Sequence, residues 1–211
     1  MTSRAFTLIE LLAVIAIIAV LAAIIFSTIG SVRKAGLRAQ CSSNMRNAGV
    51  AMLAYVNDHR GRLPGPHPYG QQTPLVRSNS AGTGFADVSI TTLLAPYLDI
   101  RPPLPGGTTK VVEILLCPAW DQATGWSSST NKGSYVLWGV NRTYCGATNA
   151  TQPEQRIPQL LIEVPSPGKT AFMTEMDANN VSGYSNQPAP VHGSIRNILY
   201  FDAHVGTQSS K

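Results

Sequence analysis

Charge is sparse in this sequence, and the motifs of most enzymes are missing. Only 13% of the 211 residues are charged, and the Lys and Arg residues behind the net charge of +5 are scattered along the chain. No stretch interleaves basic and aromatic residues as nucleic-acid surfaces do, so we expect no nucleic-acid partner. There is no GxSxG, HExxH, glycine-rich phosphate loop or paired-carboxylate motif. The sequence therefore predicts neither an enzyme nor a bound cofactor.

Proline is absent from residues 1–63, whereas all 15 prolines fall in residues 64–190. A helix can therefore run without interruption through the first part of the chain. Within the segment 6–32 the only charged residue is Glu10. The 19 residues 11–29 would span roughly 28 Å as a helix, about the thickness of the hydrocarbon core of a bilayer. The sequence predicts that this segment crosses a membrane.

Two other interpretations of the apolar segment are weaker. A buried core helix normally has a polar face, but this run is apolar on every side. A secretory signal peptide could start at Arg4 and be cut near Ala22, but its apolar core is usually only ~7 to 15 residues long. Glu10 also counts against a signal peptide, because a carboxylate costs on the order of a few kcal/mol on transfer into lipid unless a cation pairs with it.

The residues around Glu10 carry a resemblance to a known family. The string RAFTLIELL, residues 4–12, resembles the prepilin processing motif of type IV pilins and type II secretion pseudopilins. The resemblance implies cleavage between Ala5 and Phe6, methylation of the new amino group of Phe6, and a role for Glu10 in filament assembly. Ala5 stands where the family usually has Gly. The amine of Phe6 would lie in the same apolar layer as Glu10 and could pair with Glu10 of a neighbouring subunit.

Beyond the apolar segment, the helix is predicted to continue as an amphipathic one over residues 33–60, to about His59. Its apolar residues recur at spacings of three and four: Cys41, Met45, Ala48, Met52 and Tyr55. We expect this stripe to pack on the domain formed by residues 61–211. Gly30, Gly36 and Gly49 each weaken the helix, so bending or local melting is expected from Gly30 to Gly36.

Cysteine is scarce, and its three copies are far apart. Cys41, Cys117 and Cys145 show no CxxC spacing, so neither a zinc ribbon nor a thioredoxin-type pair is indicated. In an exported domain we expect one disulfide and one leftover thiol. We favour a bridge between Cys41 and Cys117, because it would tether a strand to the helical stripe and contribute roughly 4 kcal/mol in the chain-entropy model. Two buried thiols, or a bridge from Cys117 to Cys145, are the alternatives.

The part of the chain after the long helix predicts a small mixed domain. Residues 61–84 are rich in Pro, Gly, Ser and Gln and predict a loop. A short helix is expected at residues 90–98, and turns containing Pro or Gly separate the candidate strands 111–116, 134–140, 170–175 and 197–201. An antiparallel sheet packed on the long helix would bury both apolar faces. The predicted fold class is therefore α+β, and it is pilin-like in its long N-terminal helix and small sheet domain.

The later segments carry a narrower resemblance, to the large pilin-like proteins of planctomycete and verrucomicrobial bacteria. It consists of Leu116-Cys117-Pro118, Ser134-Tyr135, and His192 followed ten residues later by Asp202, with Ala203 in place of the group's Gly. One alternative is a metal site that includes His192, Asp202 and His204, with Asp177 as a further ligand. Because the His and the Asp would flank a single strand, we expect a structural role in turns and no metal.

Together these patterns predict a filament subunit. Residues 1–5 would be the leader, 6–32 the transmembrane and assembly helix, 33–60 its amphipathic continuation and 61–211 the globular domain. The expected function is that of a pilin or pseudopilin in a type IV pilus-like or type II secretion filament. The expected partners are further copies, other pilins or pseudopilins, the prepilin peptidase and methylase, the inner-membrane assembly platform and the membrane.

The alternative is a signal-anchored periplasmic binding or adhesive domain that does not polymerise. Lys and Arg residues after the apolar run favour a cytoplasmic location for the larger part of the chain. The family resemblance implies the opposite orientation, with a single-pass anchor in a bacterial inner membrane and the C-terminal domain in the periplasm. From there the subunit would enter a periplasmic or extracellular filament.

Overall fold

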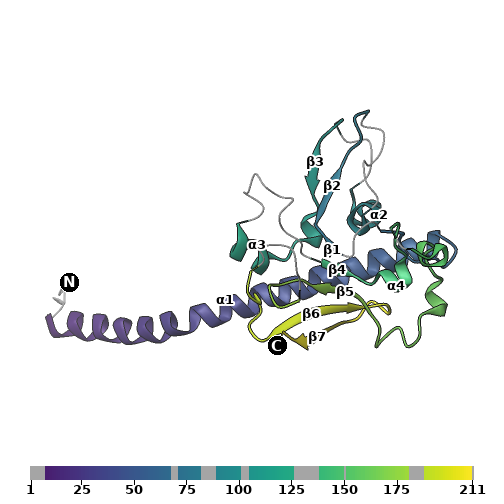
Figure 1. The fold of residues 1–211 in the computed structure, drawn as a ribbon. Helices are drawn as coiled ribbons and strands as arrows, with labels where there is room; N and C mark the ends of the chain where they lie inside the picture. The colour runs from purple at the N-terminus through teal and green to yellow at the C-terminus, as the bar shows by residue number, and fades with distance from the viewer. Residues whose placement is uncertain are drawn as a thin grey trace. The chain divides into compact units, whose positions relative to one another are not determined.

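A computed structural model describes residues 8–67, 71–81, 89–100, 105–125, 138–149, 151–180 and 188–210. Contacts within the chain define two compact units, residues 1–37 and residues 38–211. One helix, α1 (Leu8–Asp58), contributes its first part to one unit and its second part to the other (Figure 1). The predicted processing residues Ala5 and Phe6 lie outside the described residues.

The helix α1 confirms the expectation of a long, uninterrupted N-terminal helix. It runs as regular α-helix through Gly30 and Gly36, so the expectation of local melting there is wrong. Its predicted stripe is buried at every position: Cys41, Met45, Ala48, Met52 and Tyr55. The helix ends one residue before the expected His59, because Arg60 and Gly61 take left-handed φ values of 56° and 82°. Gly61 then donates its N–H to the Val56 carbonyl at 2.8 Å and closes the last turn.

The globular unit contains one five-stranded antiparallel sheet with the strand order β1-β4-β5-β6-β7. Its strands are β1 (Gln71–Gln72), β4 (Trp138–Val140), β5 (Ala171–Glu175), β6 (Ile195–Tyr200) and β7 (Val205–Ser209). The strands expected over residues 170–175 and 197–201 are thereby confirmed as β5 and β6, with small shifts of their ends. Of the strand expected over residues 134–140, the last three residues form β4 and the first four lie outside the described residues.

The sheet and the second part of α1 meet at a close contact around Gly49. A Cβ atom built on Gly49 would lie 2.8 Å from Leu199 Cδ1 and 2.9 Å from Ala203 Cβ, so only glycine lets the helix approach the β6–β7 hairpin this closely. In the core of the unit, the rings of Phe172 and Phe201 lie 5.3 Å apart. Both rings are buried, as are Met45 and Met52 of the stripe. The sheet packs on α1 as the sequence predicts.

A second, two-stranded sheet and several short helices complete the unit. The strands β2 (Leu75–Arg77) and β3 (Thr109–Val111) pair in antiparallel fashion. The helix expected over residues 90–98 is confirmed as α2 (Ile90–Leu94) followed by the 3-10 turn η1 (Ala95–Leu98). The remaining short elements are η2 (Glu113–Leu115), α3 (Pro118–Thr124), α4 (Arg142–Cys145), η5 (Pro153–Arg156) and η6 (Leu161–Glu163).

Two expectations about local structure are wrong. The segment 111–116 is not one strand, because β3 ends at Val111 and η2 follows. Val112 donates its N–H to the Pro74 carbonyl, and Leu116 donates to the Glu113 carbonyl, which turns the chain and buries Leu115. The segment 61–84 is not all loop, since it contains β1 and β2, whose pairing partners are distant in sequence.

Candidate functional site

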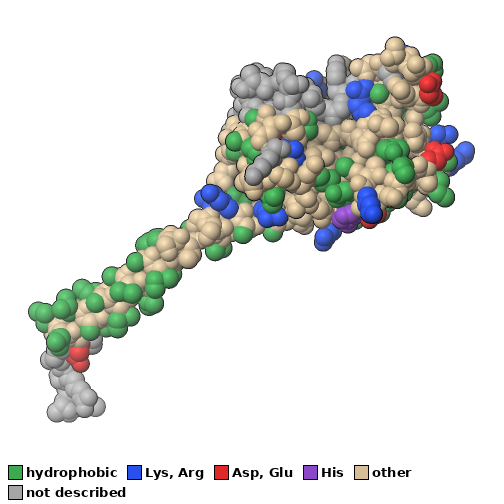
Figure 2. All heavy atoms as spheres, turned by 60° about the horizontal axis from the view of Figure 1, so that its bottom comes forward, with side chains coloured by type: hydrophobic (Ala, Val, Ile, Leu, Met, Phe, Trp, Pro, Cys, Tyr) green, Lys and Arg blue, Asp and Glu red, His purple; other side chains and the backbone are tan. Residues whose placement is uncertain are grey.

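The first candidate site is the apolar part of α1. Its large hydrophobic side chains are exposed from Leu8 to Val32. An 18-residue window of this helix has a mean hydropathy of 3.1, with none of the window buried. By length and composition alone the helix can therefore cross a membrane. A signal sequence near the N-terminus meets the same two criteria. On the face that Figure 2 shows, hydrophobic side chains line both edges of this part of the helix.

Glu10 lies in the first turn of α1 and is exposed. A carboxylate in the first turn interacts favourably with the positive end of the helix dipole. This interaction stabilises the helix start but does not remove the cost of taking the carboxylate into lipid. The apolar surface of this segment favours contact with lipid or with other apolar helices. The charge of Glu10 favours contact with a cationic group.

The second candidate site is a buried polar cluster around the Cys41–Cys117 disulfide. The two sulfurs are bonded at 2.09 Å across a sequence separation of 76 residues, and both cysteines are fully buried. The bond joins the buried stripe of α1 to the residue that precedes α3. Cys145 is a buried free thiol, and burial raises its pKa, which keeps it protonated and unreactive.

His192 reaches this disulfide from the segment before β6. Its Nε2 atom lies 3.5 Å from Cys117 Sγ and 3.2 Å from Glu175 Oε1, and both side chains of the His–Glu pair are almost fully buried. Glu175 ends β5, and its carboxylate also accepts hydrogen bonds from the main-chain N–H of Asn197 at 2.7 Å and from its side-chain amide at 3.0 Å. The carboxylate is thus held in one orientation inside the unit.

Asp177 lies near this cluster but has a different partner. The guanidinium of Arg196 donates two hydrogen bonds to its carboxylate, each at 3.1 Å, and both residues are buried. Asp177 therefore forms a bidentate ion pair and does not join His192, as the disfavoured metal-site alternative would have required.

Asp202 and His204 form a separate, exposed pair in the turn between β6 and β7. The Asp202 carboxylate accepts a hydrogen bond from the His204 main chain at 3.1 Å and lies 2.6 Å from its ring Nδ1. Desolvation is the largest single influence and raises the pKa of Asp202, but the hydrogen bonds and the electrostatic attraction of His204 together outweigh it and lower the pKa below its usual value. His192 and Asp202 thus flank β6, each with its own partner.

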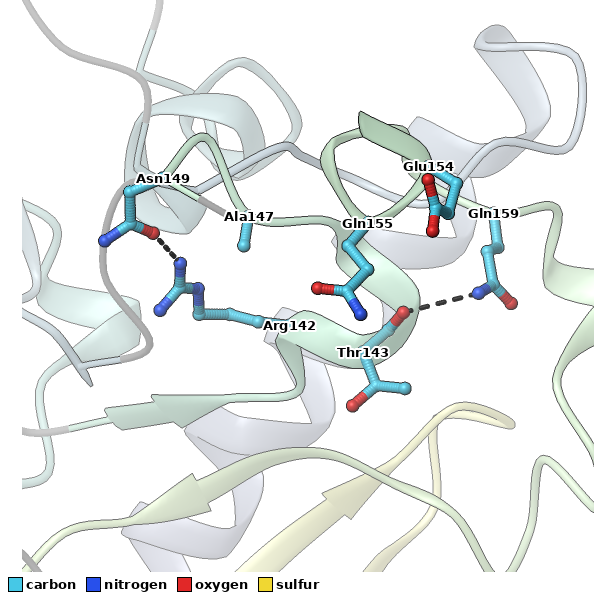
Figure 3. Close-up of a pocket in the computed structure, with 7 residues that line it drawn as sticks. All are labelled: Arg142, Thr143, Ala147, Asn149, Glu154, Gln155 and Gln159. Carbon is cyan, nitrogen blue, oxygen red and sulfur yellow. Dashed lines mark hydrogen bonds between the residues drawn. The ribbon is translucent and has the colours of Figure 1, made fainter. Parts of the chain in front are cut away.

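A third feature is a hollow of about 690 Å³ beside α4 and η5. It is lined by Arg142, Thr143, Ala147, Asn149, Glu154, Gln155 and Gln159, as Figure 3 shows. Arg142 donates to the side chain of Asn149, and Gln159 donates to the Thr143 carbonyl at 3.3 Å. Its lining offers three side-chain amides, one guanidinium, the Thr143 hydroxyl and the Glu154 carboxylate, and among the described residues no Cys, Ser or His side chain lines it.

Sequence reasoning did not identify Glu175 or Asn197 as partners of His192. The available signals were weak: an acid at the end of the apolar strand AFMTE, and Arg196-Asn197 inside a strand that is otherwise mostly apolar. Polar residues inside a buried strand usually have hydrogen-bond partners, but their identities depend on which strands become neighbours.

Comparison with known proteins identifies the N-terminal segment. Residues 1–26 match the family model described as the prokaryotic N-terminal methylation motif. No curated protein and no solved structure matches the chain. The match confirms the resemblance seen in RAFTLIELL and supports a type IV pilin-like or pseudopilin precursor, a structural class of protein and not an enzymatic one. The long apolar helix followed by antiparallel sheets is the α+β, pilin-like architecture expected for such a chain.

The match covers only the start of the chain. It does not reach the Cys-Pro, Ser-Tyr and His192–Asp202 motifs that carry the narrower resemblance. The apolar helix and the methylation motif together indicate membrane anchoring.

Proposed function

We propose that the protein is a structural subunit, a pilin or pseudopilin, of a type IV pilus-like or type II secretion filament. The observation that carries the proposal is the methylation motif placed directly at the start of a helix whose apolar side chains are exposed. In this proposal prepilin peptidase cuts between Ala5 and Phe6, and Phe6 becomes the methylated N-terminus. The chain then stays in the inner membrane, with its globular unit in the periplasm, until the assembly platform adds it to a filament.

Glu10 sets the register of assembly in this proposal. Glu10 lies four positions after Phe6 in the sequence. At 1.5 Å per residue, this spacing corresponds to about 6 Å along a helix. A subunit displaced by about that rise along its neighbour would place its Phe6 amine beside the neighbour's Glu10. Pairing with a cation offsets the cost of holding the Glu10 carboxylate in lipid, so association becomes more favourable than remaining a separate subunit.

Glu10→Leu and Glu10→Gln test this register directly. Both variants should still enter the membrane fraction, since they lower the polarity of the apolar segment, and both should be lost from sheared or secreted filaments. Glu154→Gln, the same acid-to-amide change on the exposed η5 turn, is the matched control and should assemble normally. Filaments containing Glu10→Leu at the wild-type level would contradict the proposed role of the acid.

Mass spectrometry of the mature N-terminus separates filament assembly from the alternative of a signal-anchored periplasmic domain. A filament subunit predicts a chain that begins with methylated Phe6. A mature chain that retains Met1, or that begins near Ala22, would contradict processing as a prepilin.

A further inference from the structure

We propose that Cys41, Cys117, His192 and Glu175 form a structural Zn²⁺ site when the Cys41–Cys117 disulfide is reduced. The site does not depend on filament assembly, and disulfide and metal are alternative states of the same four residues. Their ligand atoms all lie within 4.8 Å of one another. They come from four separate segments: the stripe of α1, the residue before α3, the end of β5 and the segment before β6.

The distances around His192 already fit the edges of a zinc tetrahedron. With Zn–N, Zn–O and Zn–S bonds of about 2.0, 2.1 and 2.3 Å, adjacent N and O ligands lie about 3.4 Å apart, and N and S ligands about 3.5 Å apart. The structure places His192 Nε2 at 3.2 Å from Glu175 Oε1 and at 3.5 Å from Cys117 Sγ. The Nε2 atom of His192 thus lies close to both Glu175 Oε1 and Cys117 Sγ. Ligand atoms bound to one zinc ion have the same spacing.

Reduction changes only the separation of the two sulfurs. A dithiol reductant transfers two electrons and two protons to the S–S bond, is itself oxidised to a disulfide, and leaves two thiols. Binding of Zn²⁺ then releases both thiol protons, forming two Zn–S bonds with the sulfurs about 3.8 Å apart. Rotation about the Cα–Cβ bonds of Cys41 and Cys117 supplies this opening. His192 would bind the metal through the lone pair of Nε2, so the proton that Nε2 shares with Glu175 moves to Nδ1, and Glu175 contributes a carboxylate oxygen.

The surroundings suit a structural site and not a catalytic one. The hydrogen bonds from Asn197 orient the Glu175 carboxylate, as hydrogen bonds to a ligand commonly do in metal sites. The cavity beside His192 and Glu175 has a volume of only about 10 Å³, so it offers at most the space of one water molecule. Four protein ligands and no room for a substrate give a closed site, in which the metal would tether α1 to the sheet in place of the S–S bond.

The test uses the full chain in detergent micelles, reduced with a dithiol, stripped with a chelator and titrated with Zn²⁺ and Co²⁺. We expect one metal ion per reduced chain. The Co²⁺ form should show thiolate-to-metal charge transfer and the intense visible bands of a tetrahedral ion. The oxidised chain should show neither. Bound Zn²⁺ should also slow alkylation of Cys41 and Cys117.

Variants separate the proposed ligands from other residues. His192→Ala and Glu175→Gln should each weaken Zn²⁺ binding at least tenfold, whereas His204→Ala, in the exposed turn, should leave it unchanged. Near-ultraviolet circular dichroism of each oxidised variant checks that its fold is intact. The proposal is overturned if the reduced chain binds no metal, if the oxidised chain binds it equally well, or if reduction abolishes the tertiary fold whether or not Zn²⁺ is present.

Discussion

Replacing Gly49 by Ala tests the central packing contact of the globular unit. The added Cβ would lie 2.8 Å from Leu199 Cδ1, 2.9 Å from Ala203 Cβ and 3.0 Å from Ala203 Cα. Leu199 can move the end of its side chain. Ala203 cannot retreat in the same way, because it occupies the tight β6–β7 turn with a φ of 68° and donates its N–H to the Tyr200 carbonyl at 3.0 Å.

The magnitude follows from two opposing effects. Overpacking a close contact typically costs about 1–3 kcal/mol. Replacing Gly by Ala in a helix interior stabilises by about 1 kcal/mol. Because two of the three close contacts involve Ala203, which has little freedom to move, we expect overpacking to prevail. The free energy of unfolding should fall by about 1–2 kcal/mol.

The assay is urea unfolding of the full chain in micelles, followed by near-ultraviolet circular dichroism. Gly36→Ala is the matched control in the same helix, because no atom lies within 4 Å of the Cβ position there. It should leave the midpoint unchanged or raise it. A Gly49→Ala chain as stable as the wild type would refute the argument that α1 and the β6–β7 hairpin are in close contact at this position.

Two further predictions concern buried side chains. Burial, with a smaller contribution from the Arg142 charge, lowers the pKa of His67 to about 4 from 6.5. Below pH 6.5 the unfolded chain therefore takes up a proton that the folded chain refuses, and stability should fall by about 3 kcal/mol as the pH drops toward 4. The urea midpoint should depend less on pH in His67→Gln than in the wild type. An identical pH dependence of the two midpoints would contradict the prediction. Cys41→Ser should cost about 4 kcal/mol, because it opens a long closed loop, whereas Cys145→Ala should cost only about 1 kcal/mol. Equal losses in thermal unfolding of the two variants, both measured without reductant, would argue against a stabilising bridge.

The elements that depend on nearby residues were predictable from the sequence. The absence of proline up to residue 63 and the stripe from Cys41 to Tyr55 predicted the course of α1, because helix formation and helix amphipathicity act over a few residues. The β-rich segments around β5 and β6 were predictable for the same reason. The string RAFTLIELL was also sufficient by itself, since the family match at residues 1–26 concerns a linear motif.

Other local structures depended on distant partners. β7, with the sequence Val-Gly-Thr-Gln-Ser, has little strand propensity and forms because the tight turn at Ala203 aligns it with β6. η2 replaced the end of an expected strand because β2 pairs with β3 only as far as Val111. Neither pairing is visible in the residues of the segment itself.

What the sequence by itself determined is the membrane-compatible helix, its motif and the α+β class, because each follows from short-range periodicity or from a contiguous string of residues. Only the tertiary structure decided that His192 pairs with Glu175 beside Cys117 while Asp202 pairs with His204. Those contacts join residues from separate segments, and the order of the strands in the sheet determines which side chains meet. The buried cluster is therefore a property of the packed domain and not of any one motif.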